Sequence, residues 1–95
     1  MSKMDFEWDP RKAAANLAKH GVDFEIAIEV FLDGAALLEP DDSEPGEERW
    51  RIIGLAQGRV LFVVFTERGG DVKRIISARK ATRREEREYF GQAAP

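Results

Sequence analysis

The chain has 95 residues, of which 43% are apolar, 15 are lysine or arginine and 18 are aspartate or glutamate, giving a net charge of −3. This length predicts a single domain over residues 1–95, with one core between about residues 5 and 90. The chain has no cysteine, which excludes disulfides and thiolate metal sites, and its one histidine, His20, does not supply the clustered ligands of a zinc site. No apolar run is long enough to span a membrane, and the N-terminal residues are too acidic for a signal peptide. We therefore expect a cytoplasmic protein without a metal or cofactor.

The first third of the chain is expected to form a strand and two helices. Residues 6–8 alternate between apolar and acidic side chains, which predicts a short strand. Asp9-Pro10 is typical of a helix start and Gly21 of a helix end, so a first helix is expected between them. Asp23 is the expected cap of a second helix that ends at residues 33–34. Its apolar residues repeat at helical spacing: Phe24, Ala27, Ile28 and Phe31.

The remaining residues are expected to form an antiparallel sheet and a short final helix. Residues 35–38 predict a short strand, and residues 39–48, with six acids, two prolines and a glycine, predict a solvated acidic loop. Three strands follow at residues 49–56, 60–66 and 72–79, and the first two are joined by a tight turn at Gln57-Gly58. The middle strand is apolar on both faces, which is typical of a central strand.

A capping box is expected at the start of the last helix. Thr82 and Glu85 have its spacing and predict a helix over residues 83–90, followed by a frayed tail at residues 91–95. The fold class predicted from these elements is α+β, with an N-terminal strand and two helices, a meander of antiparallel strands and a short C-terminal helix.

Positive charge is concentrated around the last predicted strand. Residues 68–84 contain seven basic residues and one acidic residue, although the chain as a whole is acidic. Such a local cluster is typical of a site for an anionic partner, and the phosphates of a nucleic acid are the obvious candidate. Four of these residues are expected to bind or steer RNA: Lys73, Lys80, Arg83 and Arg84.

Several short segments occur together in one order between about residues 5 and 90. They are Phe6–Asp9 with Lys12 and Asn16, Lys19–Val22, Phe31–Asp33, Glu48-Arg49, Ile53-Gly54, Val63–Arg68, Arg74–Ala81, and Glu86-Arg87 with Tyr89. In this order the chain resembles the BrnT family of ribonuclease toxins from bacterial type II toxin–antitoxin systems. The resemblance implies a RelE-like α+β fold and an endonuclease that acts on mRNA. It also implies a cognate, BrnA-like antitoxin with a ribbon-helix-helix domain, through which the complex would contact operator DNA.

Metal-free RNA cleavage needs a base for the 2′-hydroxyl, cations around the phosphorus and an acid for the leaving oxygen. Arg79 is the first candidate for charge stabilisation, because a guanidinium at a strand end can bind a phosphate through two parallel hydrogen bonds. Strict alternation places Arg74 on the opposite face of the strand, so we rank it below Arg79 unless the strand twists or bulges. The alternative is that both arginines pair with surface acids such as Glu67 or Glu86.

Three further residues are candidates for the proton transfers. His20 can act as a proton shuttle because histidine changes charge near neutral pH, and Lys19 can add positive charge beside it. The alternative is that both simply complement the dipole at a helix end. Glu67 can serve as a base if the strand partly desolvates it. The alternative is a turn carboxylate paired with Arg68 or Arg74.

These residues favour a toxin that is an endoribonuclease. The competing hypothesis is a non-catalytic module that keeps only the ability to bind an antitoxin or RNA. A hydrolase of small molecules is disfavoured, because the chain has no nucleophile elbow, no glycine-rich phosphate loop and no paired-carboxylate motif.

Overall fold

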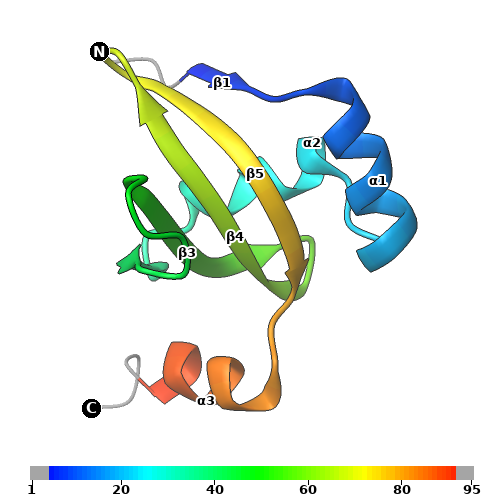
Figure 1. The fold of residues 1–95 in the computed structure, drawn as a ribbon. Helices are drawn as coiled ribbons and strands as arrows, with labels where there is room; N and C mark the ends of the chain where they lie inside the picture. The colour runs from blue at the N-terminus through cyan, green and yellow to red at the C-terminus, as the bar shows by residue number, and fades with distance from the viewer. Residues whose placement is uncertain (1–4, 92–95) are drawn as a thin grey trace.

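The computed structural model describes residues 5–91, which form one five-stranded sheet with helices packed against it (Figure 1). The elements in chain order are β1 (Asp5–Glu7), α1 (Pro10–His20), α2 (Phe24–Ala27), the 3-10 helix η1 (Ile28–Leu32), β2 (Leu37–Asp41), β3 (Arg49–Ala56), β4 (Arg59–Arg68), β5 (Val72–Lys80) and α3 (Arg83–Gly91). The predicted α+β class is confirmed. Of the expected tail at residues 91–95, Gly91 ends α3 and the rest lies outside the described residues.

The sheet has the strand order β1-β5-β4-β3-β2, so β4 is the central strand, as predicted. All neighbouring strands are antiparallel except β1, which pairs in parallel with β5. One face of the sheet packs against α1, α2 and η1 around the buried residues Val63 and Phe65. The other face is covered at one end by α3, through Tyr89 packed with Ile53 and Val60. The predicted turn at Gln57-Gly58 joins β3 to β4.

The second predicted helix is wrong in part, because it is α-helical only over α2 and continues as the 3-10 helix η1. Three residues at intervals of three, Phe24, Ala27 and Val30, are completely buried against the sheet. A 3-10 helix has three residues per turn, so this spacing keeps the apolar side chains on one face.

The acidic segment is shorter than predicted, because β2 extends through Asp41 and includes residues expected in the loop. Glu39 pairs with Arg51 across the strands and Asp41 with Arg49, which gives these acids cationic neighbours in the sheet. Pro40 is tolerated because β2 is an edge strand, where one side needs no backbone donor.

A β-bulge in β5 corrects the expected placement of two arginines. Val64 pairs with Ser77 whereas the next residue, Phe65, pairs with Ile75, so Ile76 is the extra residue. Beyond the bulge the alternation of faces is reversed. Arg79, opposite Phe62, and Arg74, opposite Thr66, therefore lie on the same face of the sheet. They are separated by about 13 Å, since four residues along a strand span roughly 3.3 Å each.

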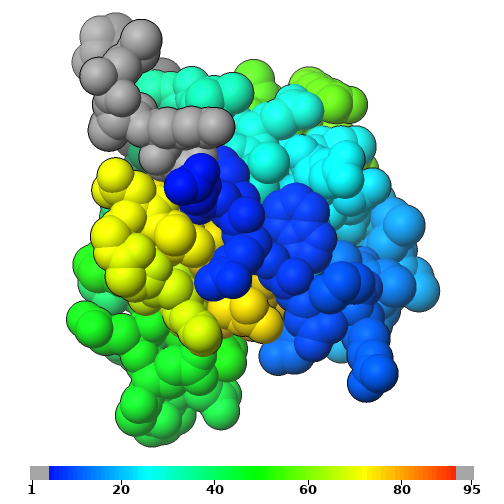
Figure 2. Space-filling model, turned by 90° about the horizontal axis from the view of Figure 1, so that it is seen from above, coloured from blue at the N-terminus to red at the C-terminus, as the bar shows by residue number. Residues whose placement is uncertain are grey.

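Asn16 connects α1 to the edge of β5. Its Nδ2 donates to the carbonyl oxygens of Ala78 (2.8 Å) and Val22 (3.0 Å), and its Oδ1 accepts from the Ala78 N–H (3.1 Å). The amide thus acts like a neighbouring strand where β1 has ended, since β1 pairs only with Val72–Arg74. Seen from above, the dark blue β1 residues lie beside the yellow start of β5 (Figure 2).

The capping box of α3 is confirmed, because the Thr82 N–H donates to Glu85 Oε1 and the Glu85 N–H donates to Thr82 Oγ1. Within residues 5–91, no helix has the length and apolar character needed to cross a membrane.

Candidate functional site

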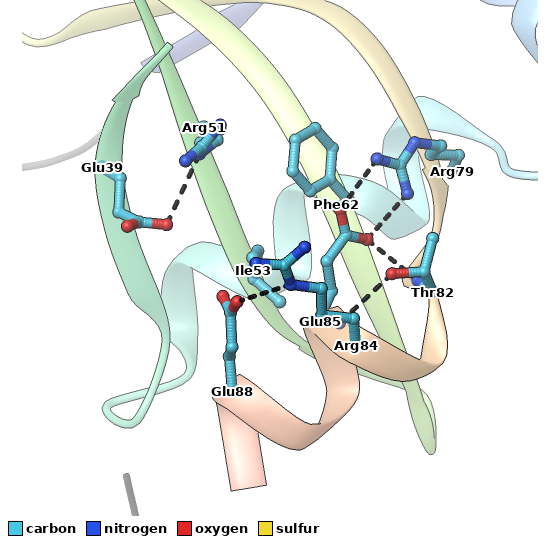
Figure 3. Close-up of a pocket in the computed structure, with 9 residues that line it drawn as sticks. All are labelled: Glu39, Arg51, Ile53, Phe62, Arg79, Thr82, Arg84, Glu85 and Glu88. Atoms are coloured by element: carbon cyan, nitrogen blue, oxygen red, sulfur yellow. Dashed lines mark hydrogen bonds and ion pairs between the residues drawn. The ribbon is translucent and has the colours of Figure 1, made fainter. Parts of the chain in front are cut away.

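A hollow of about 350 Å³ lies on the open face of the sheet, beside the start of α3 (Figure 3). Its floor contains Ile53 and Phe62, from β3 and β4. The described residues that line it include three arginines and three glutamates: Arg51, Arg79, Arg84, Glu39, Glu85 and Glu88. The charges therefore balance. Each arginine lies within ion-pair distance of one of these glutamates.

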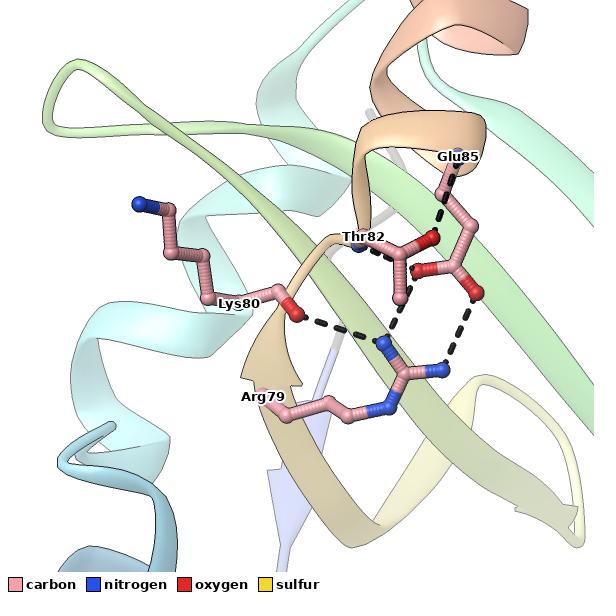
Figure 4. Close-up of polar contacts among 4 residues, drawn as sticks. All are labelled: Arg79, Lys80, Thr82 and Glu85. Atoms are coloured by element: carbon pink, nitrogen blue, oxygen red, sulfur yellow. Dashed lines mark hydrogen bonds and ion pairs between the residues drawn. The ribbon is translucent and has the colours of Figure 1, made fainter.

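Arg79 is held in one orientation by three groups (Figure 4). Its Nη1 and Nη2 donate to the two carboxylate oxygens of Glu85, at 2.8 and 3.0 Å, and Nη1 also donates to the Lys80 carbonyl oxygen at 3.2 Å. The guanidinium carbon lies 4.0 Å from the centre of the Phe62 ring. A guanidinium has five N–H groups. Within residues 5–91, the Nε–H and one Nη2–H of Arg79 thus have no hydrogen-bond partner, and these two can bind an oxyanion.

The Arg79–Glu85 contact keeps both groups ionised. The hydrogen bond that Arg79 donates to Glu85 raises the pKa of Arg79 despite some desolvation. The hydrogen bond from Arg79 lowers the pKa of Glu85, and bonds from Thr82 add to this against the opposing effect of desolvation. The alternative expected for Arg79 was an ion pair with a surface acid such as Glu67 or Glu86. Arg79 does form an ion pair, but its partner is Glu85.

Arg51 and Glu85 are site residues that the sequence reasoning did not single out. Arg51 Nε lies 3.4 Å from Glu39 Oε1, yet this nitrogen is buried and makes no hydrogen bond of acceptable geometry. The neighbouring Arg49 Nε is also buried without a hydrogen-bond partner among the described residues. The sequence does contain a signal for Arg51, because side chains alternate along the strand predicted at residues 49–56 and this puts Arg51 on the same face as Ile53.

The structure places Arg74, Lys73 and Glu67 away from this hollow. Arg74 Nη1 lies 3.6 Å from Glu7 Oε2, and Lys73 Nζ lies 3.6 Å from Glu67 Oε2. The Glu67 carboxylate is exposed, so the desolvation expected to make it a base is absent, and its partner is neither Arg68 nor Arg74.

Lys19 and His20 are exposed residues in the last turn of α1 and line a different hollow, with Ser77 of β5. Lys80 and Arg83 are also exposed, and only Arg84 of the predicted RNA-binding residues lines the Arg79 hollow. The structure therefore distributes the five predicted catalytic residues over four places: Arg79 at its hollow, Lys19 and His20 at the second hollow, Arg74 beside Glu7, and Glu67 beside Lys73. Among residues 5–91, no group of three or more His, Asp or Glu side chains is arranged to hold a metal ion.

The comparisons with known proteins agree with the fold. The family model described as the ribonuclease toxin BrnT of type II toxin–antitoxin systems matches residues 8–85. The crystal structure of the ribonuclease toxin BrnT of Brucella abortus superposes with a TM-score of 0.69 at 32% identity, covering 85% of this chain and all of that one. No curated protein matched the sequence. The chain therefore belongs to the BrnT family of ribonuclease toxins of type II toxin–antitoxin systems.

Proposed function

We propose that this chain is an endoribonuclease that cleaves mRNA without a metal ion and is neutralised by a cognate ribbon-helix-helix antitoxin. Family membership supports the ribonuclease class and an antitoxin partner. The two free N–H groups of Arg79, beside a hollow on the open sheet face, support this place for the reaction. In this proposal the toxin acts in the cytoplasm and reaches operator DNA only through the antitoxin.

The reaction needs a bound phosphodiester and a strand flexible enough for in-line attack. A phosphate against Nε and Nη2 of Arg79 would receive two parallel hydrogen bonds without displacing Glu85. The 2′-hydroxyl loses its proton to Glu85, its oxygen attacks the phosphorus, the bond to the 5′-oxygen breaks, and the leaving 5′-oxygen takes up a proton from water. The products are a 2′,3′-cyclic phosphate and a 5′-hydroxyl end. Arg79 stabilises the negative charge that builds up on the phosphate oxygens during the attack.

Glu85 is the proton acceptor in this proposal, because it is the carboxylate that contacts Arg79. Its pKa lies below the ordinary value of 4.5, so it is ionised at neutral pH. We expect kcat/KM to stay constant as the pH falls to about 5 and to decline only below 4.5. If a histidine were the base, kcat/KM would instead fall below about pH 6.5, because the imidazole becomes protonated there. The pH profiles of kcat/KM for the wild type and for His20→Gln distinguish a glutamate base from a histidine base. A fall in kcat/KM near pH 6.5 that disappears in the variant contradicts the role of Glu85.

Substitution of Arg79 tests the place of the reaction. We expect Arg79→Ala to lower kcat about 100- to 1000-fold, the usual effect of losing one transition-state donor group. The kcat of Arg79→Lys should fall by a similar factor, since an ammonium group cannot form two parallel hydrogen bonds to a phosphate. The measurement is cleavage of single-stranded RNA in the presence of a chelator. The matched control is Arg59→Ala, an exposed arginine that does not line the hollow.

The alternative is a non-catalytic module that binds an antitoxin or RNA. The charge balance of the Arg79 hollow favours it, because every arginine there already has a glutamate neighbour. Expression without the antitoxin separates the two. The endoribonuclease arrests bacterial growth and Arg79→Ala relieves the arrest. A module leaves growth normal, and the purified protein leaves RNA intact.

A further inference from the structure

A second hollow, of about 230 Å³, lies between α1 and the bulge of β5. It is lined by Lys12, Asn16, Lys19 and His20 on one side and by Ile76 and Ser77 on the other. We infer that this hollow binds a phosphate of the RNA strand next to the bond that is cut. The inference rests on the proposed ribonuclease function and adds a subsite to it.

The charge of this hollow differs from that of the Arg79 hollow. None of the described residues that line it is acidic, and its two lysines have no ion-pair partner within residues 5–91. The Arg79 hollow contains as many glutamates as arginines and so gives little net attraction to a polyanion. Attraction of the phosphate backbone therefore needs unpaired cations elsewhere, and the α1–β5 hollow provides them.

Helix stability does not explain the position of Lys12. Lys19 and His20 lie in the last turn of α1, where positive charge complements the dipole. Lys12 lies in the first turn, which contains no acid and where positive charge is unfavourable. It nevertheless lines the same hollow as Lys19, two turns further along the helix. A bound anion accounts for both lysines.

The two walls of the hollow are fixed before any ligand arrives. The buried Asn16 makes three hydrogen bonds, two of them with the backbone of Ala78, which follows Ser77. The hollow is thus preorganised, so binding requires little additional ordering of the protein.

The position along β5 selects a phosphodiester strand as the occupant. Ser77 and Arg79 pair with Val64 and Phe62, two residues apart on one face of the sheet. They are about 7 Å apart, at roughly 3.3 Å per residue. An RNA strand bound at Arg79 can therefore continue past the Ser77 hydroxyl to the lysines of α1.

The test measures binding of the full chain to a short single-stranded 2′-O-methyl RNA, which lacks the attacking hydroxyl. For Lys12→Gln/Lys19→Gln we expect weaker binding and a slope of log affinity against log salt that is smaller by about 0.7, the value for one phosphate contact on a single strand. The control is Arg11→Gln, which removes one positive charge, against two in the double variant, from a neighbouring exposed residue that does not line the hollow and should keep the slope. All three replaced residues are exposed, and an unchanged melting temperature shows that the variants are folded.

A slope that stays at the wild-type value, or that changes equally in Arg11→Gln, overturns the inference. So does a double variant that loses antitoxin binding while its RNA slope is kept, since the occupant is then an acidic protein segment. Wild-type protein that binds this RNA through the two lysines but cleaves no RNA contradicts the proposed function and leaves the subsite standing. Cleavage that depends on Arg79, together with an unchanged slope, supports the proposed function and overturns the subsite.

Discussion

The contact between Tyr89 and Asp33 fixes the C-terminal helix to the body of the protein. The Tyr89 hydroxyl donates to Asp33 Oδ2 at 2.5 Å, and the Leu55 and Ala35 N–H groups donate to the same carboxylate at 2.9 Å. Desolvation acts to raise the pKa of Asp33, but these hydrogen bonds, the Tyr89 bond first, lower it overall. The hydrogen bond to Asp33, followed by desolvation, raises the pKa of Tyr89 to about 12.

We expect Tyr89→Phe to lower the free energy of unfolding by about 2 kcal/mol, the usual contribution of a hydrogen bond to a charged group. Because the pKa of Tyr89 rises from 10 to about 12 on folding, this contribution is complete below pH 10 and is lost as the pH rises towards 12. Urea unfolding of both proteins near neutral pH and above pH 10 measures the difference. In an Asp33→Asn background the effect should shrink. Equal effects in both backgrounds would contradict the pairing.

At the scale of elements, α3 is held to the sheet mainly at its first turn and through Tyr89. Glu85 contributes twice, because its carboxylate completes the capping box with Thr82 and binds Arg79. One side chain therefore connects the helix start to the end of β5, and the orientation of Arg79 depends on the attachment of α3.

We expect Glu85→Gln to speed amide hydrogen exchange in α3 about fivefold, the effect of roughly 1 kcal/mol of local stability, and to leave β4 unchanged. The folded pKa of Glu85 is lowered, so its stabilisation is present above the ordinary value of 4.5 and is lost as the pH falls through the folded value. The difference between wild type and variant should therefore narrow in acid. Glu88→Gln, on the same helix and exposed, is the control. Equal acceleration in α3 and β4 would show that the whole fold is weakened instead.

The sequence predicted the start of α3 but not the second role of Glu85. The spacing of Thr82 and Glu85 identifies a capping box because its bonds are local. Arg79 reaches Glu85 from the open face of β5, and the extra residue Ile76 reverses the alternation so that Arg74 lies on this face as well. Composition does not reveal a bulge, so strict alternation separated Arg74 from Arg79 incorrectly.

At the scale of the whole molecule, the central strand and its turn could be read from the sequence because they depend on local pattern. β4 is apolar on both faces, and Gln57 and Gly58 adopt the positive φ angles, 49° and 79°, of a tight hairpin turn. The assembly of the site could not be read in this way. His20, Glu67 and Arg79 come from α1, β4 and β5, and only the packing of these elements shows that each lies in a different place.

The acidic segment between β2 and β3 is expected to oppose RNA binding by the whole molecule. Asp42, Glu44 and Glu48 are exposed, and replacing them by their amides raises the net charge from −3 to 0 without touching the Glu47–Arg49 pair.

We expect this triple variant to associate with uncleavable RNA severalfold faster at low salt, because long-range repulsion is reduced, and to match the wild type at high salt, where charges are screened. Stopped-flow association rates across a salt series measure this. The matched control neutralises three other exposed acids, Asp5, Glu25 and Asp71, for the same change in net charge. A larger effect in the first variant locates the repulsion in the acidic segment, which follows Glu39 of the Arg79 hollow by three residues. Equal effects would assign it to net charge alone, and no effect in either would contradict electrostatic control of RNA binding.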